Sequence, residues 1–180
     1  MSPGVRESLV RVGPFVGGLL VLAVLAAVRP IARERMAWKA VPARVLVRWL
    51  LLWAGWVVLT ELVTRALHVP DPPRFAVGGA ALGIRLVGVV VLAPLLEELA
   101  FRGVLFTLLL PRLGAVPTLL LTAAIFTAGH TQYGVLDLTQ VFLDGVLFGL
   151  ARLRTGSTRV PFWMHALGNA VSALQRLRPG

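Results

Sequence analysis

The chain has 180 residues, of which 57% are hydrophobic and 14% are charged, and its formal net charge is +10. This composition and a mean hydropathy of +0.83 lie far from those of a water-soluble domain and predict that much of the surface faces lipid. The chain has no cysteine, which excludes disulfides, thiolate catalysis and cysteine metal sites.

Apolar runs separated by breakers predict a succession of helices. The predicted helices lie at residues 14–28, 46–67, 76–93 with a continuation through a kink at Pro94 to about 110, 116–130, 136–151 and 160–176. The first run follows Arg6 and Arg11 and is interpreted as an uncleaved helix, because no polar cleavage region comes after it. Residues 68–74, with three prolines, and residues 155–157 are predicted to be loops.

These runs also predict the fold class. Unpaired backbone groups are costly in hydrocarbon, and the runs lack the alternating pattern of a barrel, so the fold is expected to be all-α. A membrane span needs roughly 20 apolar residues. We therefore expect a polytopic transmembrane bundle of about six to eight helices, in which residues 1–180 form a single integral membrane domain.

The basic residues gather between the apolar runs. Residues 29–48 contain the single acid Glu34 and six basic residues, namely Arg29, Arg33, Arg35, Lys39, Arg44 and Arg48. Such a loop is expected on the cytoplasmic side, together with Arg112 and residues 152–159, with the N-terminus outside. Because topology explains the positive charge, the expected partners include the lipid bilayer and exclude nucleic acid.

Two carboxylates and an arginine interrupt the third apolar run. Inserting an ionisable group to membrane depth costs at least about 2.5 kcal/mol on insertion scales, so a structural or functional role is expected for each of these residues. Glu98 and Arg102 are four residues apart on one helical face and are expected to pair. Glu97 is rotated by about 100° around the helix from Glu98, so it does not share this pair and is the candidate catalytic carboxylate. The alternative is structural, with a buried ion pair and a helix-packing hydrogen bond.

Two further polar groups lie within or beside apolar helices. His130 ends the predicted helix 116–130, where a histidine can also act as a cap or an interfacial residue. His165 and Asn169 are four residues apart and share a helical face. Both can donate hydrogen bonds to a developing negative charge, or alternatively bond to a neighbouring helix.

Together, these residues form three ordered motifs within about residues 85–175. The motifs are Glu97-Glu98-x-x-x-Arg102, Phe126-x-x-x-His130 and His165-x-x-x-Asn169. They resemble the signature motifs of the CAAX protease and bacteriocin-processing (CPBP, or Abi) family, which includes the type II CAAX prenyl endopeptidases. The resemblance implies a metal-independent, glutamate-type intramembrane endopeptidase without a cofactor.

The resemblance also implies residue roles. Glu97 and His130 would activate a water molecule, and His165 with Asn169 would form the oxyanion hole. Glu98, Arg102 and Phe126 would support the site. These roles suit peptide hydrolysis, which needs a base for the water proton and donors aimed at the oxyanion.

Two other functions compete with this one. In a zinc-dependent membrane protease, Glu97, His130 and His165 would be the metal ligands, although the chain has no H-E-x-x-H motif. The family resemblance also extends to proteins of bacteriocin self-immunity, and in such a non-catalytic membrane scaffold the motifs would serve packing.

The expected substrate is a peptide or protein, membrane-associated, whose C-terminal processing or maturation the enzyme would perform. Lys39 is the only lysine among 18 Lys and Arg residues, and this arginine-rich composition favours a multi-pass protein of a bacterial inner membrane. Asp144 is expected either to face the polar cavity or to pair with an arginine. Ser157 and Thr158 are expected to begin the last helix rather than act as nucleophiles, because no G-x-S-x-G elbow is present.

Overall fold

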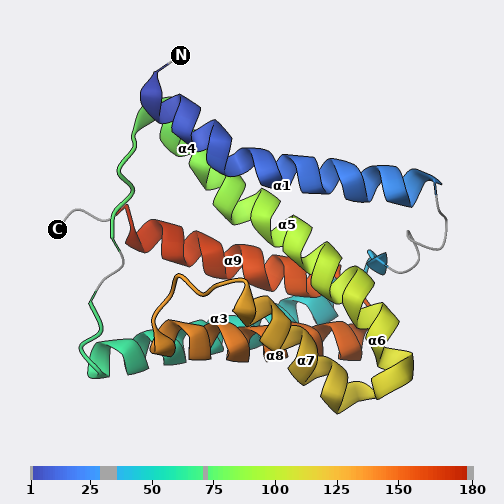
Figure 1. Cartoon of the computed structure of the whole chain (residues 1–180). Coiled ribbons are helices and arrows are strands. Elements are labelled where there is room, and N and C mark those ends of the chain that lie inside the picture. Colours follow the sequence, from blue (N-terminus) through green and yellow to red (C-terminus); the bar gives the residue numbers. More distant parts are fainter. Residues whose placement is uncertain (1, 29–35, 71–72, 178–180) are drawn as a thin grey trace.

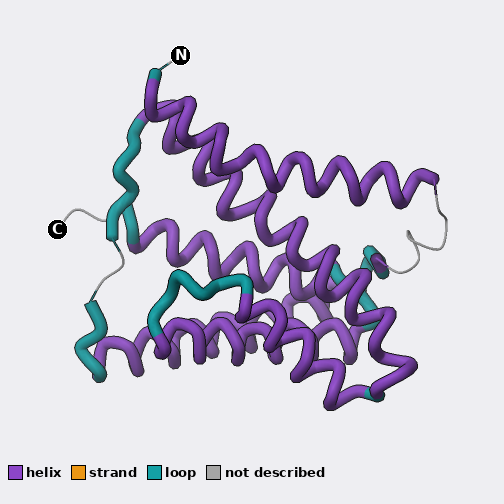
Figure 2. The backbone as a smooth tube through the Cα atoms, viewed as in Figure 1, coloured by secondary structure: helices purple, strands orange, loops and turns teal. Residues whose placement is uncertain are grey.

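A computed structural model of the chain describes residues 2–28, 36–70 and 73–177. Every regular element in these ranges is helical, which confirms the expected all-α class. The α-helices are α1 (Pro3–Val28), α3 (Ala43–Ala66), α4 (Gly79–Val87), α5 (Ala93–Glu98), α6 (Phe106–Leu113), α7 (Ala115–Ala128), α8 (Val135–Thr155) and α9 (Arg159–Gln175) (Figure 1). Two π-helical segments, η1 (Gly88–Leu92) and η2 (Leu99–Leu105), lie on either side of α5. Figure 2 shows the same path, with loops between the helices and at the ends of the described chain.

The elements from α4 to α6 join into one helical rod, Gly79–Leu113, of 35 residues. When this rod is counted as one helix, the described residues form six helices. The sequence predicted a kink at Pro94, whereas the structure has the π-helical segment η1 directly before it. Proline has no N–H and its ring clashes with the carbonyl four residues earlier, so the helix widens: the Ala93 N–H bonds to Gly88 O, five residues back.

Several predicted boundaries need correction. The first helix begins at Pro3 rather than at residue 14, and Arg11 pairs with Glu7 one turn earlier at 3.0 Å. Arg44 and Arg48, predicted in a loop, lie on α3, while residues 29–35 of that loop lie outside the described residues.

The loop predicted at residues 155–157 also starts later than expected. Thr155 is the last residue of α8, and the helix ends at Gly156 with a φ of 66°. Glycine carries no side chain that would oppose this left-handed conformation, so it is a favourable helix terminator.

Helix α9 has a central place in the fold. It contacts α3 and α8 along one side and η1 and α5 along the other. Helix α1 packs against α4, η1 and α5, and α7 packs along α8 (Figure 1). Because α9 touches the rod Gly79–Leu113 directly, side chains of α5 and α9 can meet inside the bundle.

Residues 36–39 close the bundle at the start of α9. The Thr158 N–H donates to Ala37 O at 2.9 Å, and the Thr158 hydroxyl donates to Met36 O at 2.7 Å. The Ser157 hydroxyl donates to the Lys39 carbonyl. A Cβ atom at Gly103 would lie only 3.1 Å from the Met36 backbone, so the absence of a side chain at Gly103 favours this close approach. Ser157 and Thr158 thus lead into the last helix, as expected, with their hydroxyls bound to the backbone.

Two helices of the described residues, α3 and the rod Gly79–Leu113, are long and apolar enough to cross a membrane by length and composition. The expected bundle of about six to eight transmembrane helices is therefore not confirmed. Helix α7 is apolar but has 14 residues, and α9 has 17. Helix α8 has 21 residues but carries four charged residues, namely Asp137, Asp144, Arg152 and Arg154.

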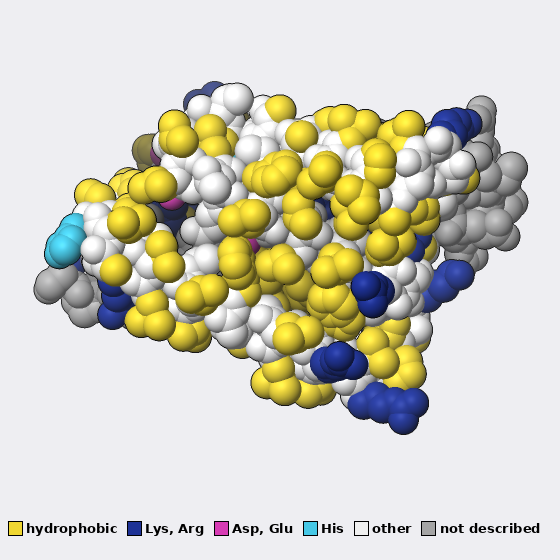
Figure 3. All heavy atoms as spheres, turned by 90° about the horizontal axis from the view of Figure 1, so that it is seen from below, with side chains coloured by type: hydrophobic (Ala, Val, Ile, Leu, Met, Phe, Trp, Pro, Cys, Tyr) yellow, Lys and Arg dark blue, Asp and Glu magenta, His cyan; other side chains and the backbone are white. Residues whose placement is uncertain are grey.

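The surface is nevertheless rich in large apolar side chains. Figure 3 shows hydrophobic side chains over most of one face, with Lys and Arg mainly near its ends. On α3 the exposed apolar side chains include Leu51, Leu52, Val58, Leu59 and Leu62, and on α7 they include Val116, Leu120 and Ile125. Soluble monomers rarely expose apolar patches of this extent, so the surface suits contact with lipid.

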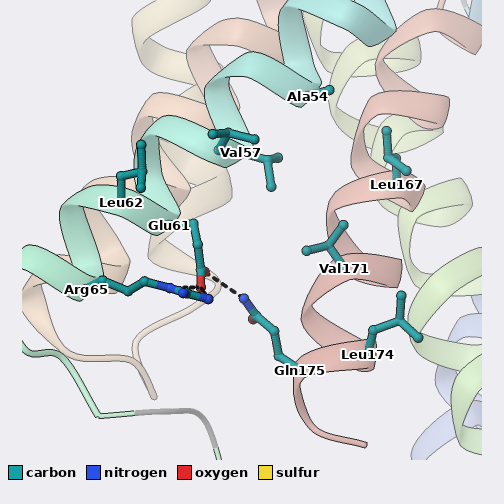
Figure 4. Close-up of a pocket in the computed structure, with 10 residues that line it drawn as sticks. Ala54, Val57, Glu61, Leu62, Arg65, Leu167, Val171, Leu174 and Gln175 are labelled. Atoms are coloured by element: carbon teal, nitrogen blue, oxygen red, sulfur yellow. Dashed lines mark hydrogen bonds and ion pairs between the residues drawn. The ribbon is translucent and has the colours of Figure 1, made fainter. Parts of the chain in front are cut away.

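A groove of about 560 Å³ separates α3 from α9 (Figure 4). Its walls are mostly aliphatic, including Val57, Leu62 and Val171. At one end Glu61 accepts hydrogen bonds from Arg65 on α3 and from Gln175 on α9, each at 2.7 Å. None of the motif residues lines this groove, so it is separate from the site described next.

Candidate active site

The first motif forms a buried ion pair inside the rod. Arg102 donates from one terminal nitrogen to Glu98 Oε1 at 3.0 Å, and both side chains are fully buried. The predicted pairing at a spacing of four is therefore confirmed. The other terminal nitrogen of Arg102 donates to Gly145 O at 3.0 Å. The arginine thus ties the rod to α8 and satisfies a backbone carbonyl there.

Aromatic rings surround the Arg102 guanidinium. Its central carbon lies 4.7 Å from the ring centre of Phe126, 5.3 Å from that of Phe148 and 6.0 Å from that of Phe101. The negative faces of such rings attract a cation, and more strongly when water is excluded. Phe126, expected to support the site, therefore helps to stabilise the buried charge.

His165 on α9 lies between the two carboxylates. Its Nδ1 is 3.0 Å from Glu98 Oε1, and its Nε2 is 3.6 Å from Glu97 Oε2. The ring stacks on Phe148 with centres 5.1 Å apart and meets the Phe126 ring edge-on at 5.8 Å. Glu97 and Glu98 point away from the helix in different directions, as expected. Both still lie near the His165 imidazole, because its two nitrogens are on different sides of the ring.

His130 follows the end of α7 and packs on the same phenyl ring. Its Nδ1 lies 2.9 Å from Phe126 O, and its ring centre is 4.8 Å from that of Phe126. A carbonyl oxygen only accepts hydrogen bonds, so Nδ1 carries a proton and Nε2 of the neutral ring is an acceptor. Both His130 and His165 interact electrostatically with Glu97. The two histidines thus pack against the same Phe126 ring.

Asn169 forms a hydrogen bond to a neighbouring helical segment, which was the alternative to its expected role in the oxyanion hole. Its Nδ2 donates to Val89 O at 2.8 Å, across the interface between α9 and η1. In the π-helical register the partner of Val89 O would be the N–H of residue 94, which is a proline. Asn169 therefore satisfies a carbonyl that Pro94 leaves without a helical partner. The amide has a second N–H for other contacts.

This contact predicts a stability effect. Asn169→Ala should lower the free energy of unfolding by about 1 kcal/mol, because the Val89 carbonyl loses its donor. Gln175→Ala is a suitable control on the same helix, since Gln175 bonds to the side chain of Glu61 and not to the backbone. Thermal unfolding of the purified protein in detergent measures both. Equal midpoints for Asn169→Ala and the wild type would show that Val89 O does not depend on this amide.

The metal-dependent alternative would need a set of side chains placed to bind one metal ion. In the part of the chain that the structure describes, no group of three or more His, Cys, Asp or Glu side chains is placed to hold a metal ion. Glu97, His130 and His165 share a region but do not form a closed set of ligands in this structure.

Comparison with known proteins identifies the family of this chain. The family model described as type II CAAX prenyl endopeptidase Rce1-like matches residues 80–171, a range that includes all three motifs. The chain belongs to the Rce1-like family. The description of this family names an endopeptidase, and Rce1-like proteins are membrane proteins. The matched range lies close to residues 85–175, where the sequence placed the resemblance.

One curated relative of this Rce1-like chain is an uncharacterized 24.3 kDa protein of Escherichia coli. The two are 36% identical over 89 residues, which make up 46% of this chain and 39% of the relative. The match thus spans less than half of either protein. No solved structure matches the chain.

The Rce1-like site also depends on α8 residues that sequence reasoning missed. Arg152 donates from Nε to Arg102 O at 3.0 Å and from a terminal nitrogen to the Thr107 hydroxyl at 3.2 Å. Gly145 and Phe148, also on α8, contact Arg102. Gly145, Phe148 and Arg152 are separated by three and four residues, so they lie on one face of the helix. This spacing is the signal that could have identified a face of α8 directed at the motif.

Asp144, for which the sequence left two interpretations open, has a different partner. Its Oδ1 accepts a hydrogen bond of 2.7 Å from the Trp56 indole N–H on α3. The indole of a neighbouring helix, and not an arginine, is thus its hydrogen-bond partner, while the other interpretation, that Asp144 faces the polar cavity, stays a prediction. Asp144 thus links α8 to α3 beside the Rce1-like motifs.

Proposed function

We propose that this chain is an intramembrane endopeptidase of the glutamate type, which hydrolyses a peptide bond near the membrane surface. The observation that carries the proposal is the position of His165 between Glu97 and Glu98, against the same phenyl ring as His130. This arrangement brings an acid, a proton acceptor and hydrogen-bond donors together, as acyl hydrolysis requires.

The two acids have unequal freedom to react. Glu98 is fully buried and bound to both Arg102 and His165. The Glu97 side chain is 23% exposed, and its nearest ionic contact, with His165, is 3.6 Å long. Water can therefore reach Glu97 and not Glu98. This difference supports Glu97 as the general base and Glu98 as a residue that holds His165 and Arg102.

The proposed reaction begins with a water molecule beside Glu97. As its oxygen attacks the carbonyl carbon, its proton passes to Glu97, assisted by the acceptor Nε2 of His130. The tetrahedral oxyanion accepts hydrogen bonds from the second N–H of Asn169 and from the Nε2–H of His165, whose two ring nitrogens both carry protons at this step. The intermediate then collapses, the C–N bond breaks, and the stored proton moves to the leaving nitrogen. The products are one carboxylate and one amine.

We further propose that the protein is a multi-pass protein of a bacterial inner membrane. The two long apolar helices and the apolar exposed surface support this location. Basic residues Lys39 and Arg159 lie in neighbouring segments at the start of α9, as expected for loops on one side of the membrane. The substrate in this proposal is a membrane-associated peptide or protein that is matured or trimmed at its C-terminus.

The test compares the protein termini of cells with and without the gene, by mass spectrometry of membrane and secreted fractions. A set of new termini should appear only when the gene is present. In H2 18O each new C-terminal carboxylate should carry one 18O, since hydrolysis places one water oxygen on the acyl carbon. Identical termini in both strains would contradict the proposal, and activity that depends on stoichiometric zinc would replace it with the metal-dependent alternative.

A further inference from the structure

His130 lies outside the regular helix that positions it. Helix α7 ends at Ala128, and residues 129–134 form the loop to α8 (Figure 2). The His130 N–H still bonds to Thr127 O at 2.8 Å, but the next residues are exposed and leave the helical path. A side chain in such a turn needs contacts of its own to hold one orientation.

The Phe126 side of the helix supplies two of these contacts, namely the carbonyl that binds Nδ1 and the phenyl ring. A third contact comes from within the loop. The Tyr133 ring stacks on the His130 ring with centres 5.7 Å apart and an interplanar angle of 26°. The Tyr133 N–H also donates to His130 O at 3.0 Å, which closes the turn and fixes the separation of the two rings.

We propose that Tyr133 is a positioning residue that holds the His130 imidazole, by ring stacking, in the orientation that presents Nε2 to the water beside Glu97. This inference rests on the proposed function for its effect on catalysis, but not for its effect on the histidine. Offset stacking at this separation is a favourable aromatic geometry. Tyr133 is 42% exposed, so it lies on the outer side of the His130 ring and is not part of the core.

The contact involves the ring of Tyr133 and not its hydroxyl. Among the described residues, the hydroxyl has no hydrogen-bond partner, whereas the ring stacks on His130. Tyr133→Phe should therefore preserve the function of the residue, and Tyr133→Ala should remove it. Gln132→Ala is the matched control, because Gln132 is an exposed neighbour in the same turn.

The direct test is NMR of the protein with isotope-labelled histidine. The chain has three histidines, and the His130 signals are identified by their loss in His130→Gln. In Tyr133→Ala the His130 ring signals should shift and broaden, while those of His68 and His165 stay unchanged. Tyr133→Phe and Gln132→Ala should match the wild type. Unchanged His130 signals in Tyr133→Ala would overturn the inference, whether or not the protein cleaves peptides.

Turnover supplies the second readout. Tyr133→Ala should lower kcat by about 3- to 10-fold with an unchanged KM, in line with the strength of one aromatic pair. Tyr133→Phe should restore kcat to within about twofold of the wild type. An equal loss in both variants would overturn the inference, since it would assign the effect to the hydroxyl. Where Tyr133→Ala does not fold, Tyr133→Leu fills the space without stacking and should show the same loss.

Discussion

Replacement of Glu97 by Gln is expected to lower kcat by about 100- to 10,000-fold, the range associated with loss of a general base. The amide has nearly the shape of the carboxylate but cannot accept the water proton at this step. Because the Glu97 side chain is partly exposed and its contact with His165 is long, the variant should still fold and insert. Mass spectrometry of the cleavage product over time measures the loss.

Glu7→Gln is the matched control for this variant. Glu7 is also a glutamate on a helix, but its side chain is 52% exposed and pairs with Arg11, far from the motifs in the sequence. It should retain wild-type turnover. Near-normal cleavage by Glu97→Gln would remove Glu97 from the reaction and with it the glutamate-type mechanism.

Replacement of Arg102 by Leu should lower the free energy of unfolding by about 3–5 kcal/mol, the cost of breaking a buried ion pair by removing one partner. The reason is the charge left behind: Glu98 is fully buried, and without Arg102 its remaining ionic partner is His165. The Gly145 carbonyl also loses its donor. Thermal or denaturant unfolding in detergent measures the effect, together with the yield of folded protein.

Two further variants separate charge from packing. Arg11→Leu removes an arginine at the same helical spacing from an exposed pair and should change stability little. Glu98→Gln combined with Arg102→Leu removes both charges and should recover part of the lost stability. A double variant as unstable as Arg102→Leu alone would show that the aromatic packing of Arg102, and not its charge, stabilises the bundle.

The sequence predicted the parts of the site that depend on local spacing. Glu98 and Arg102 pair because four residues make about one helical turn, and that relation holds in any helix. The all-α class followed in the same way from long apolar runs. The number of spans was less predictable, since a short helix such as α7 and a charged one such as α8 give weak composition signals.

Contacts between distant segments could not be predicted from spacing. The bond from Asn169 to Val89 O arises from the π-helical register before Pro94, which the sequence suggested only as a kink. The hydrogen bond from Trp56 to Asp144 joins residues 88 positions apart, and the sequence around either residue does not indicate its partner. The bridge that His165 makes between both glutamates likewise depends on how α9 packs against α5.

The most direct test of the account is a double-mutant cycle between Glu97 and His130, measured as kcat/KM of the wild type, Glu97→Gln, His130→Gln and the double variant. If both side chains act on one water molecule, removing the second should cost little once the first is lost, as happens for catalytic residues that act as a unit. The double variant should then be about as active as the weaker single variant. Losses that multiply would show independent roles and would contradict the shared water.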